Sequence, residues 1–173
     1  MVAGAIRILG IDPGSRLTGF GIIDVPGRGG QPRPVHHGAI RAGTGEFPER
    51  LGIIFNELTA LVREYRPDQA AVETVFVAHN AASAIKLGQA RGAAICALIA
   101  EGVSVAEYSP RSIKQAIVGR GGAEKEQVQH MVRVLLGLAA APQADAADAL
   151  AVALCHHHTA ETLERMARPA RRP

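Results

Sequence analysis

Four acidic residues stand inside segments that are otherwise apolar, where contact with solvent does not explain them. Asp12 ends the run AIRILGID, Glu73 interrupts AAVETV, and Asp145 and Asp148 lie in QADAADALAVAL. A buried carboxylate is costly without a partner. Carboxylates gathered at about 4 Å also repel one another by about 4 kcal/mol per pair at an effective dielectric near 20. A fold that buries these segments therefore needs something that neutralises the acids.

The hydrophobic pattern changes character along the chain. Residues 5–12, 17–25 and 35–41 form three β-type runs with short turns, which predicts an antiparallel meander. Helical spacing over 47–65 predicts an amphipathic crossover helix. Strands and helices then alternate: a strand at 69–75, a helix at 81–101, a strand at 103–108, a short helix opened by Ser109 and Pro110, and helices at about 124–138 and 143–158. This order predicts an α/β fold with a five-stranded mixed sheet and helices on both faces.

The predicted topology can bring the four acids together. A crossover helix between the meander and the next strand makes the strands of Asp12 and Glu73 neighbours. Asp145 and Asp148 are three residues apart, so they share one face of the last helix. An Asp at a strand end, a Glu within a strand and a helical DxxD are together typical of RNase H-like nucleases. We expect one nuclease domain over residues 1–158 and a basic, disordered tail over 159–173.

Composition excludes several classes of protein. No apolar run of the 173 residues approaches the roughly 18 to 20 that a membrane span needs, and the N-terminus lacks the pattern of a signal peptide. Cys96 and Cys155 show no metal-binding spacing and are expected to be buried thiols. We therefore expect a cytoplasmic protein with no membrane partner.

The type of donor atom in the acidic cluster indicates which metal ion it would bind. The cluster contains carboxylate oxygens only, which favour Mg²⁺, with Mn²⁺ as a substitute, over Zn²⁺. Two such ions would permit in-line displacement at phosphorus, in which one generates hydroxide and the other stabilises the leaving oxygen. Simpler interpretations exist for two of the acids. Asp12 precedes Pro13 and Gly14 and could be a turn former, and Asp145 could interact only with the helix dipole.

Longer strings give a more specific indication. LGIDPGSRLTGFGII, AVETVFVAHNAASAIKLGQARG, YSPRSIKQAIVGRGGAEKEQVQHMV and PQADAADALAVALCHHH follow one another between residues 9 and 158. In order and spacing they resemble the RuvC family of Holliday-junction resolvases. The resemblance implies that Asp12, Glu73, Asp145 and Asp148 are the catalytic, metal-binding acids. Some relatives carry histidine at the position of Asp145, so this chain is of the all-carboxylate type.

The same resemblance implies an activity and partners. The family consists of magnesium-dependent endonucleases that act as homodimers and nick two opposed strands of a four-way DNA junction symmetrically, in recombination and repair. A branch-migration motor complex is the implied protein partner. The helix at 81–101, rich in Ala and Gly, is the expected dimer contact, although small residues equally suit packing on the sheet.

Candidate DNA contacts gather around a glycine-rich loop. Lys114 and Lys125 match basic residues of the family that bind the strand or stabilise charge at the cut. Arg120 and Arg111 lie beside the same loop and could equally form a solvated basic face. By resemblance Phe76 would stack on a base at the crossover, unless it is a core residue at a strand end. His79 is a candidate phosphate contact.

Two other functions compete with this interpretation. LGIDPGSRLTG is also similar to the first phosphate loop of actin-like phosphotransferases, but those enclose a nucleotide between two copies of the domain. A chain of 173 residues has room for one copy. A non-catalytic junction-binding protein would recognise branched DNA through phosphate contacts alone and would not need four converging acids.

Overall fold

The computed structural model describes residues 4–27, 30–74 and 80–167, with the side chains of residues 164 and 165 left undescribed. Phe76 and His79 therefore lie outside the described residues. The secondary structure comprises β1 (Ile6–Asp12), β2 (Leu17–Val25), β3 (Arg33–Arg41), α1 (Phe47–Tyr65), β4 (Gln69–Glu73), α2 (Ala81–Ala100), β5 (Ser104–Tyr108), α3 (Pro110–Val118), α4 (Lys125–Leu135) and α5 (Ala144–Ala167).

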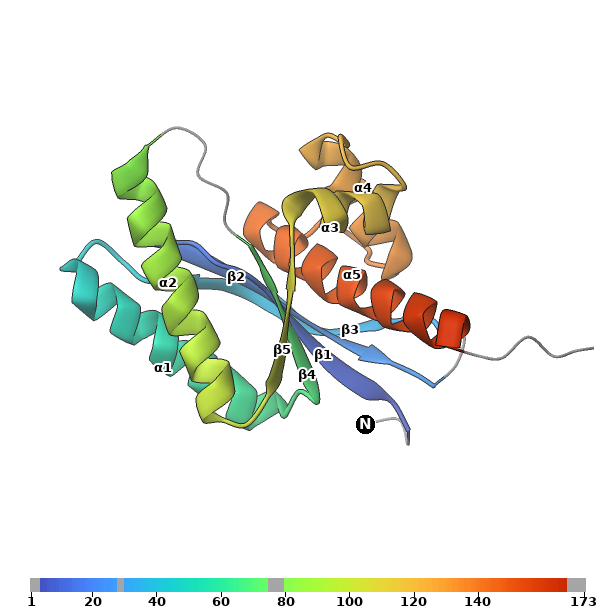
Figure 1. Cartoon of the computed structure of the whole chain (residues 1–173), viewed down its shortest axis with the longest axis horizontal. Coiled ribbons are helices and arrows are strands. Elements are labelled where there is room, and N and C mark those ends of the chain that lie inside the picture. The colour runs from blue at the N-terminus through green and yellow to red at the C-terminus, as the bar shows by residue number, and fades with distance from the viewer. Residues whose placement is uncertain (1–3, 28–29, 75–79, 168–173) are drawn as a thin grey trace, which may run out of the picture.

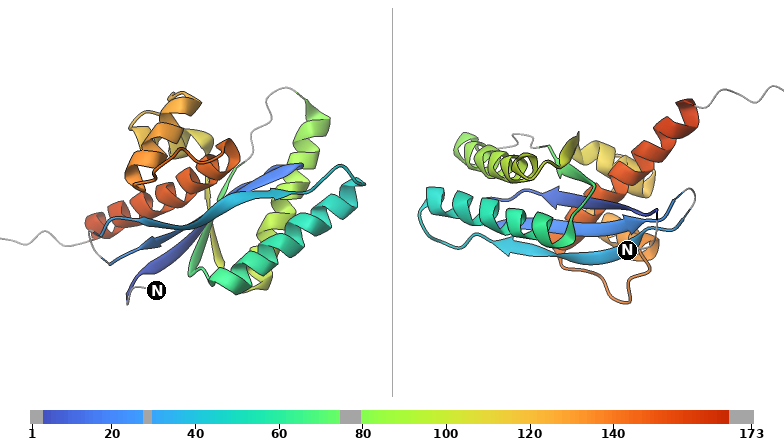
Figure 2. Two further views of the ribbon diagram at one scale, coloured as in Figure 1. Left: turned by 180° about the vertical axis from the view of Figure 1, so that it is seen from behind. Right: turned by 90° about the horizontal axis from the view of Figure 1, so that it is seen from below.

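The five strands form one mixed sheet in the order β3-β2-β1-β4-β5. The β1–β2 and β2–β3 pairs are antiparallel, whereas β1–β4 and β4–β5 are parallel. Helices α1 and α2 cover one face, and α3, α4 and α5 cover the other (Figure 1). The views in Figure 2 show the same two layers from behind and from below. The predicted RNase H-like fold, with its mixed sheet and helices on both faces, is confirmed.

Each face of the sheet has its own hydrophobic core, because side chains alternate along a strand. In β1, Ile8 belongs to the core beneath α3–α5, whereas Leu9 and Ile11 belong to the core beneath α1 and α2. In β4 the alternation continues, with Ala71 facing α5 and Val72 facing the other side. This alternation decides which face receives the acidic side chains at the strand ends.

Helix α5 packs directly on the backbone of the sheet at positions where the strands carry glycine. A Cβ atom on Gly10 would lie 2.2 Å from the carbonyl oxygen of Ala149, and one on Gly19 would lie 2.1 Å from that of Asp145. At Gly21 the added carbon would lie 2.7 Å from the side chain of Leu150. Real Cβ atoms do not approach so closely, so a helix at this depth requires glycine beneath it.

Local capping explains where two helices begin. Asn80 accepts hydrogen bonds from the backbone N–H groups of Ala82 and Ser83 at the start of α2. Ser109 accepts one from the N–H of Ser112, and Pro110 occupies the first turn of α3, as predicted. No helix in the described part of the chain combines the length and hydrophobicity that a membrane span requires.

Two expectations from the sequence are wrong. Residues 159–167 were expected to belong to a disordered tail, but α5 continues through them to Ala167. The strong helix formers of this stretch extend the helix beyond the sheet, and the Thr159 and Thr162 hydroxyls bond the carbonyls four residues earlier. Cys155 is buried as expected, but Cys96 is exposed because it lies on the outer side of α2.

Candidate active site

Two of the four acids come from neighbouring parallel strands. The β1–β4 register pairs Ile11 with Val72, so Asp12 and Glu73 are the next residues along the two strands. Because both side chains follow the alternation of Gly10 and Ala71, they emerge on the α5 face of the sheet. The sheet therefore places two carboxylates side by side under the start of α5.

The other two acids come from the first two turns of α5. Residue Asp12 is paired with Gly19 of β2, and the backbone of Asp145 rests directly on that glycine. Asp148 follows one turn later, next to Ala149, which rests on Gly10. The glycines thus set α5 at the depth at which its acids meet those of β1 and β4.

The carboxyl groups of the site act on one another electrostatically. Burial, followed by the charges of Glu73, Asp148 and Asp145, raises the pKa of Asp12 from 3.8 to about 8, against a lowering by Lys125. Burial and then Asp148 raise the pKa of Glu73, while a hydrogen bond from Asp12 and the charges of Lys125 and Lys114 oppose that increase. In the absence of another cation, Asp12 therefore holds a proton at neutral pH.

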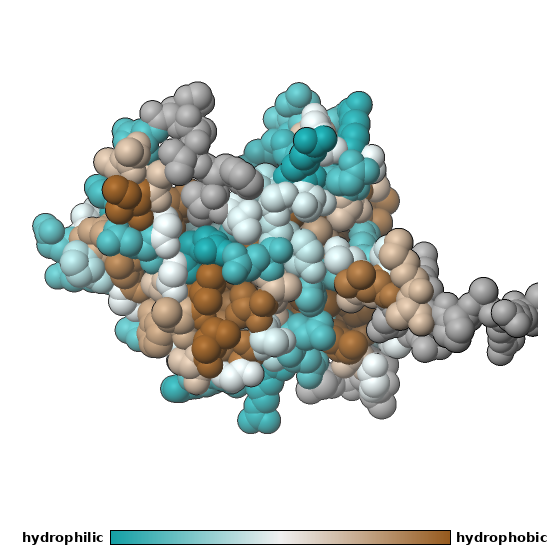
Figure 3. All heavy atoms as spheres, viewed as in Figure 1, coloured by the Kyte–Doolittle hydropathy of each residue, from teal (hydrophilic) through white to brown (hydrophobic). Residues whose placement is uncertain are grey.

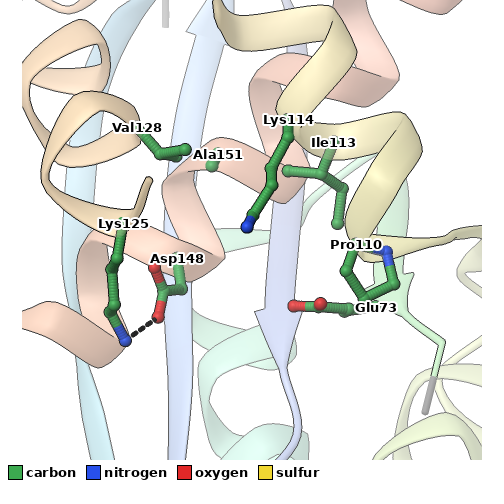
Figure 4. Close-up of a pocket in the computed structure, with 8 residues that line it drawn as sticks. All are labelled: Glu73, Pro110, Ile113, Lys114, Lys125, Val128, Asp148 and Ala151. Carbon is green, nitrogen blue, oxygen red and sulfur yellow. Dashed lines mark ion pairs between the residues drawn. The ribbon is translucent and has the colours of Figure 1, made fainter. Parts of the chain in front are cut away.

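A lysine supplies the cation nearest to the acids. Lys125 Nζ lies 2.6 Å from Asp148 Oδ2, and this hydrogen bond raises the pKa of Lys125 (Figure 4). Among the described residues, no set of three or more His, Cys, Asp and Glu side chains is already arranged around one metal ion. Asp148 is thus paired with an ammonium group, and the four carboxylates are not in a metal-binding arrangement.

A cavity of about 170 Å³ opens beside the acids. Its polar residues are Glu73, Asp148, Lys114 and Lys125, and its apolar wall consists of Pro110, Ile113, Val128 and Ala151. Lys114 extends from α3 toward the space between Glu73 and Asp148 (Figure 4). The site therefore offers oxygen donors and two ammonium groups side by side, which suits a reaction on a phosphodiester bound through cations.

Comparison with known proteins places the chain in a family. The family model described as "Crossover junction endodeoxyribonuclease RuvC" matches residues 8–156. The chain belongs to the RuvC family. A RuvC from Alkalilimnicola ehrlichii is 56% identical over 162 residues, covering 94% of this chain and 97% of the relative. One from Methylococcus capsulatus is 56% identical over 166 residues, covering 96% and 99%.

A solved RuvC structure shares the fold over nearly the whole chain. The Thermus thermophilus RuvC in complex with Holliday junction substrate superimposes with a TM-score of 0.85 at 37% identity, covering 91% of this chain and 96% of the other. Membership of the RuvC family makes this chain one of the crossover junction endodeoxyribonucleases, and it accounts for the four motif strings of the sequence.

Of the predicted DNA contacts, two lysines lie at the cavity and one arginine lies on the surface. Lys114 and Lys125 line the cavity beside the acids. Arg120 is exposed, and its Nη2 donates to the side chain of Gln127, which also accepts a hydrogen bond from the backbone N–H of Glu124 at the start of α4. One N–H group of Arg120 is thus used in a hydrogen bond to Gln127 and is not free for DNA.

Sequence reasoning missed three kinds of residue at this site. The glycines beneath α5, the apolar wall of the cavity and Arg91 of α2 were not predicted. Arg91 Nε donates to the main-chain carbonyl oxygen of Glu73 at 3.2 Å. A signal for the glycines was available, because Gly19 and Gly21 alternate with large apolar residues in a predicted strand.

The titration of Asp12 leads to a testable pH dependence of stability. The folded, metal-free protein holds a proton on Asp12 up to about pH 8, whereas the unfolded chain releases it near 3.8. The stabilising contribution of Asp12 to the free energy of unfolding is therefore complete below pH 3.8. It is lost as the pH rises from there to about 8. For one proton the loss is at most about 1.4 kcal/mol per pH unit.

Urea unfolding in EDTA between about pH 5 and about pH 8 measures this contribution. Asp12→Asn, which is neutral throughout, is expected to unfold with a weaker pH dependence than the wild type, because its side chain has no proton to release. Identical pH dependence in the two proteins would contradict the raised pKa of Asp12.

Proposed function

We propose that this chain resolves four-way DNA junctions as a Mg²⁺-dependent endonuclease that makes paired, symmetric nicks as a homodimer. The observation that carries the proposal is the convergence of Asp12 and Glu73 with the DxxD of α5, next to Lys114 and Lys125. A RuvC solved with Holliday junction substrate shares the fold over 91% of this chain, which supports the choice of substrate. We propose a cytoplasmic location and a branch-migration complex as partner as well, and the family membership supports both.

The donor set of the site fits hard divalent cations. Asp12, Glu73, Asp145 and Asp148 would hold Mg²⁺, or Mn²⁺ in its place, two ions per site, because oxygen is the donor that both prefer. When bound, the ions supply Lewis acidity, which lowers the pKa of water and stabilises the charge on the leaving oxygen. Binding requires that Asp12 lose its proton and that Asp148 exchange its partner, Lys125.

The two lysines have separate tasks in this proposal. Lys125, once released from Asp148, has its ammonium group free for a phosphate oxygen at the site mouth. Lys114 lines the cavity and makes no ion pair with any described residue. It therefore can bind the phosphate of the cut strand without first giving up a partner.

Lys114→Ala is expected to weaken cleavage and to reduce the salt dependence of junction binding by about one unit of the log–log slope, because each phosphate contact contributes about 0.9. Titrations at several salt concentrations in Ca²⁺ measure the slope. Arg63→Ala is the matched control, since it also removes one positive charge. Arg63 lies at the end of α1 that is far from the acids, where it pairs with Glu101. Equal slopes in Lys114→Ala and the wild type would argue against a phosphate contact.

An exposed apolar stripe on α2 supports the homodimer. Ile85 and Ile99 are 63% and 58% exposed, and Cys96 between them is also exposed. A Cβ atom on Gly88 or Gly92 would meet nothing within 4 Å, so the stripe leaves room for the backbone of another helix. Hydrophobic residues gather on the α2 side of the molecule in Figure 3. Sedimentation equilibrium that shows only monomer at micromolar concentration would contradict this part of the proposal.

One cleavage assay tests the function. Purified protein is incubated with a mobile four-way junction, with plain duplex and with single-stranded DNA, each with and without Mg²⁺. Nicking of the junction alone, at symmetric positions and only with the metal, is the expected result. Junction binding without nicking in Mg²⁺ would favour a non-catalytic junction-binding protein, and calorimetric binding of ATP would favour an actin-like phosphotransferase.

A further inference from the structure

Arg91 of α2 makes two contacts that join three elements of the fold. Its Nε donates a hydrogen bond to the main-chain carbonyl oxygen of Glu73, and its Nη2 forms an ion pair with the Glu107 carboxylate of β5. The Arg91 side chain is 20% exposed, against 52% for Glu107. The Arg91 side chain thus lies mostly beneath the surface, between the helix and the ends of two strands.

The carbonyl that Arg91 binds belongs to the last residue of β4. The ladder between β1 and β4 ends at the pair Ile11 and Val72, one residue before Glu73. On the other side, the N–H of Thr74 donates to the carbonyl oxygen of Tyr108 at the end of β5. The β4–β5 register holds Glu73 opposite Tyr108, but the β1–β4 register ends before Glu73, and Arg91 binds its carbonyl oxygen there, so the direction in which the Glu73 side chain leaves the backbone depends on this contact as well.

We propose that Arg91 is a positioning residue, which fixes the main chain of Glu73 so that its carboxylate meets Asp12 and the acids of α5. The inference rests on the proposed function of the four acids as metal ligands. Arg91 approaches Glu73 from the α2 side, whereas the acids converge on the α5 face. It therefore acts through the backbone of Glu73 and does not contact the metal or DNA.

The contacts separate this role from a simple effect of charge. The cations that act on the Glu73 carboxyl group are Lys125 and Lys114, both on the α5 side of the sheet. The positive charge of Arg91 faces Glu107 instead. Outer partners that orient a ligand typically change metal affinity by 10-fold to 100-fold when they are removed.

The experiment compares Arg91→Met with Arg91→Lys. Arg91→Met keeps the apolar stem and loses both donors, whereas the ammonium group of Arg91→Lys cannot reproduce the two-pronged geometry. Binding of Mn²⁺ to each protein without DNA is followed by electron paramagnetic resonance. The Mg²⁺ concentration that gives half-maximal junction nicking is measured as well, at a temperature well below each melting temperature.

The matched control is Arg63→Met. Arg63 also joins a helix to a glutamate, Glu101, but at the opposite end of α1 and α2 from the acids. We expect Arg91→Met to raise the Mn²⁺ dissociation constant and the half-maximal Mg²⁺ concentration about tenfold. Arg91→Lys should give a smaller increase, and Arg63→Met should leave both values at the wild-type level.

Wild-type Mn²⁺ affinity in Arg91→Met would overturn the proposal, even if the melting temperature fell, because a purely structural contact lowers stability only. Should Arg91→Met fail to fold, Arg91→Lys decides: weaker Mn²⁺ binding supports the role, and unchanged binding overturns it. Failure of the wild type to nick junctions would contradict the proposed function, but the Mn²⁺ titration would still report whether Arg91 positions Glu73.

Discussion

Replacing Asp12 with Asn is expected to reduce junction nicking in Mg²⁺ about a thousandfold and to leave junction binding in Ca²⁺ or EDTA nearly unchanged. Asp12 is the acid on which the charges of all three other carboxylates act, so it lies at the centre of the cluster. Loss of a central ligand removes several kcal/mol of transition-state stabilisation, and each 1.4 kcal/mol corresponds to a factor of ten in rate. Binding persists because it depends on cationic contacts to phosphates, which this change does not remove.

Single-turnover nicking and electrophoretic mobility shifts measure the two effects separately. Asp68→Asn is the matched control, because Asp68 lies at the opposite end of the β1–β4 pair, where its carboxylate accepts a hydrogen bond from the Arg7 N–H. An amide oxygen can accept that bond equally well. A nicking rate in Asp12→Asn as high as that of Asp68→Asn would show that the acids have been assigned the wrong role.

Replacing Gly19 with Ala is expected to disable the site without altering any acid. The new methyl carbon would lie 2.1 Å from the carbonyl oxygen of Asp145 and 2.7 Å from its carbonyl carbon. Backbone cannot yield as a flexible side chain does, so the first turn of α5 must move away from the sheet by roughly 1 Å. A misplacement of about that size can cost about a hundredfold in rate, and overpacking costs about 1 to 3 kcal/mol of stability.

Gly52→Ala is the control for this prediction. Gly52 is exposed in α1, and a Cβ atom there would meet nothing within 4 Å. The control should gain about 1 kcal/mol in stability, because alanine is the better helix former. Mn²⁺ affinity, nicking rate and urea unfolding are compared for the two variants. Wild-type metal affinity in Gly19→Ala would mean that α5 does not depend on this glycine for its position.

The parts of the fold that the sequence predicted are those with a local cause. Alternating apolar residues, helical spacing and the caps at Ser109 and Pro110 depend on neighbours a few residues apart, so the meander and the β/α order could be inferred directly. The end of the last helix could not be inferred in this way. Arginines and prolines near the C-terminus suggested disorder from residue 159, yet α5 continues to Ala167.

The exposure of Cys96 had to be seen in the structure for a similar reason. Its alanine-rich surroundings suit a buried helix face as well as an interface, and only the packing of α2 on α1 and the sheet decides between them. The same holds for Arg91, whose partners Glu73 and Glu107 are 18 and 16 residues away. A side chain that joins three elements leaves no periodic signal in the sequence.

The amino-acid sequence by itself determined which chemistry is available: four carboxylates in apolar segments, no sulfur or imidazole donor required, and lysines near a glycine-rich loop. Tertiary structure alone decided that Lys125 pairs with Asp148, that the pKa of Asp12 is raised, and that α5 rests on Gly10 and Gly19. The physical reason is that hydrogen-bonding type and charge belong to each residue. Desolvation and Coulombic coupling depend instead on distances between segments far apart in the chain, and those distances exist only once the sheet and α5 have packed together.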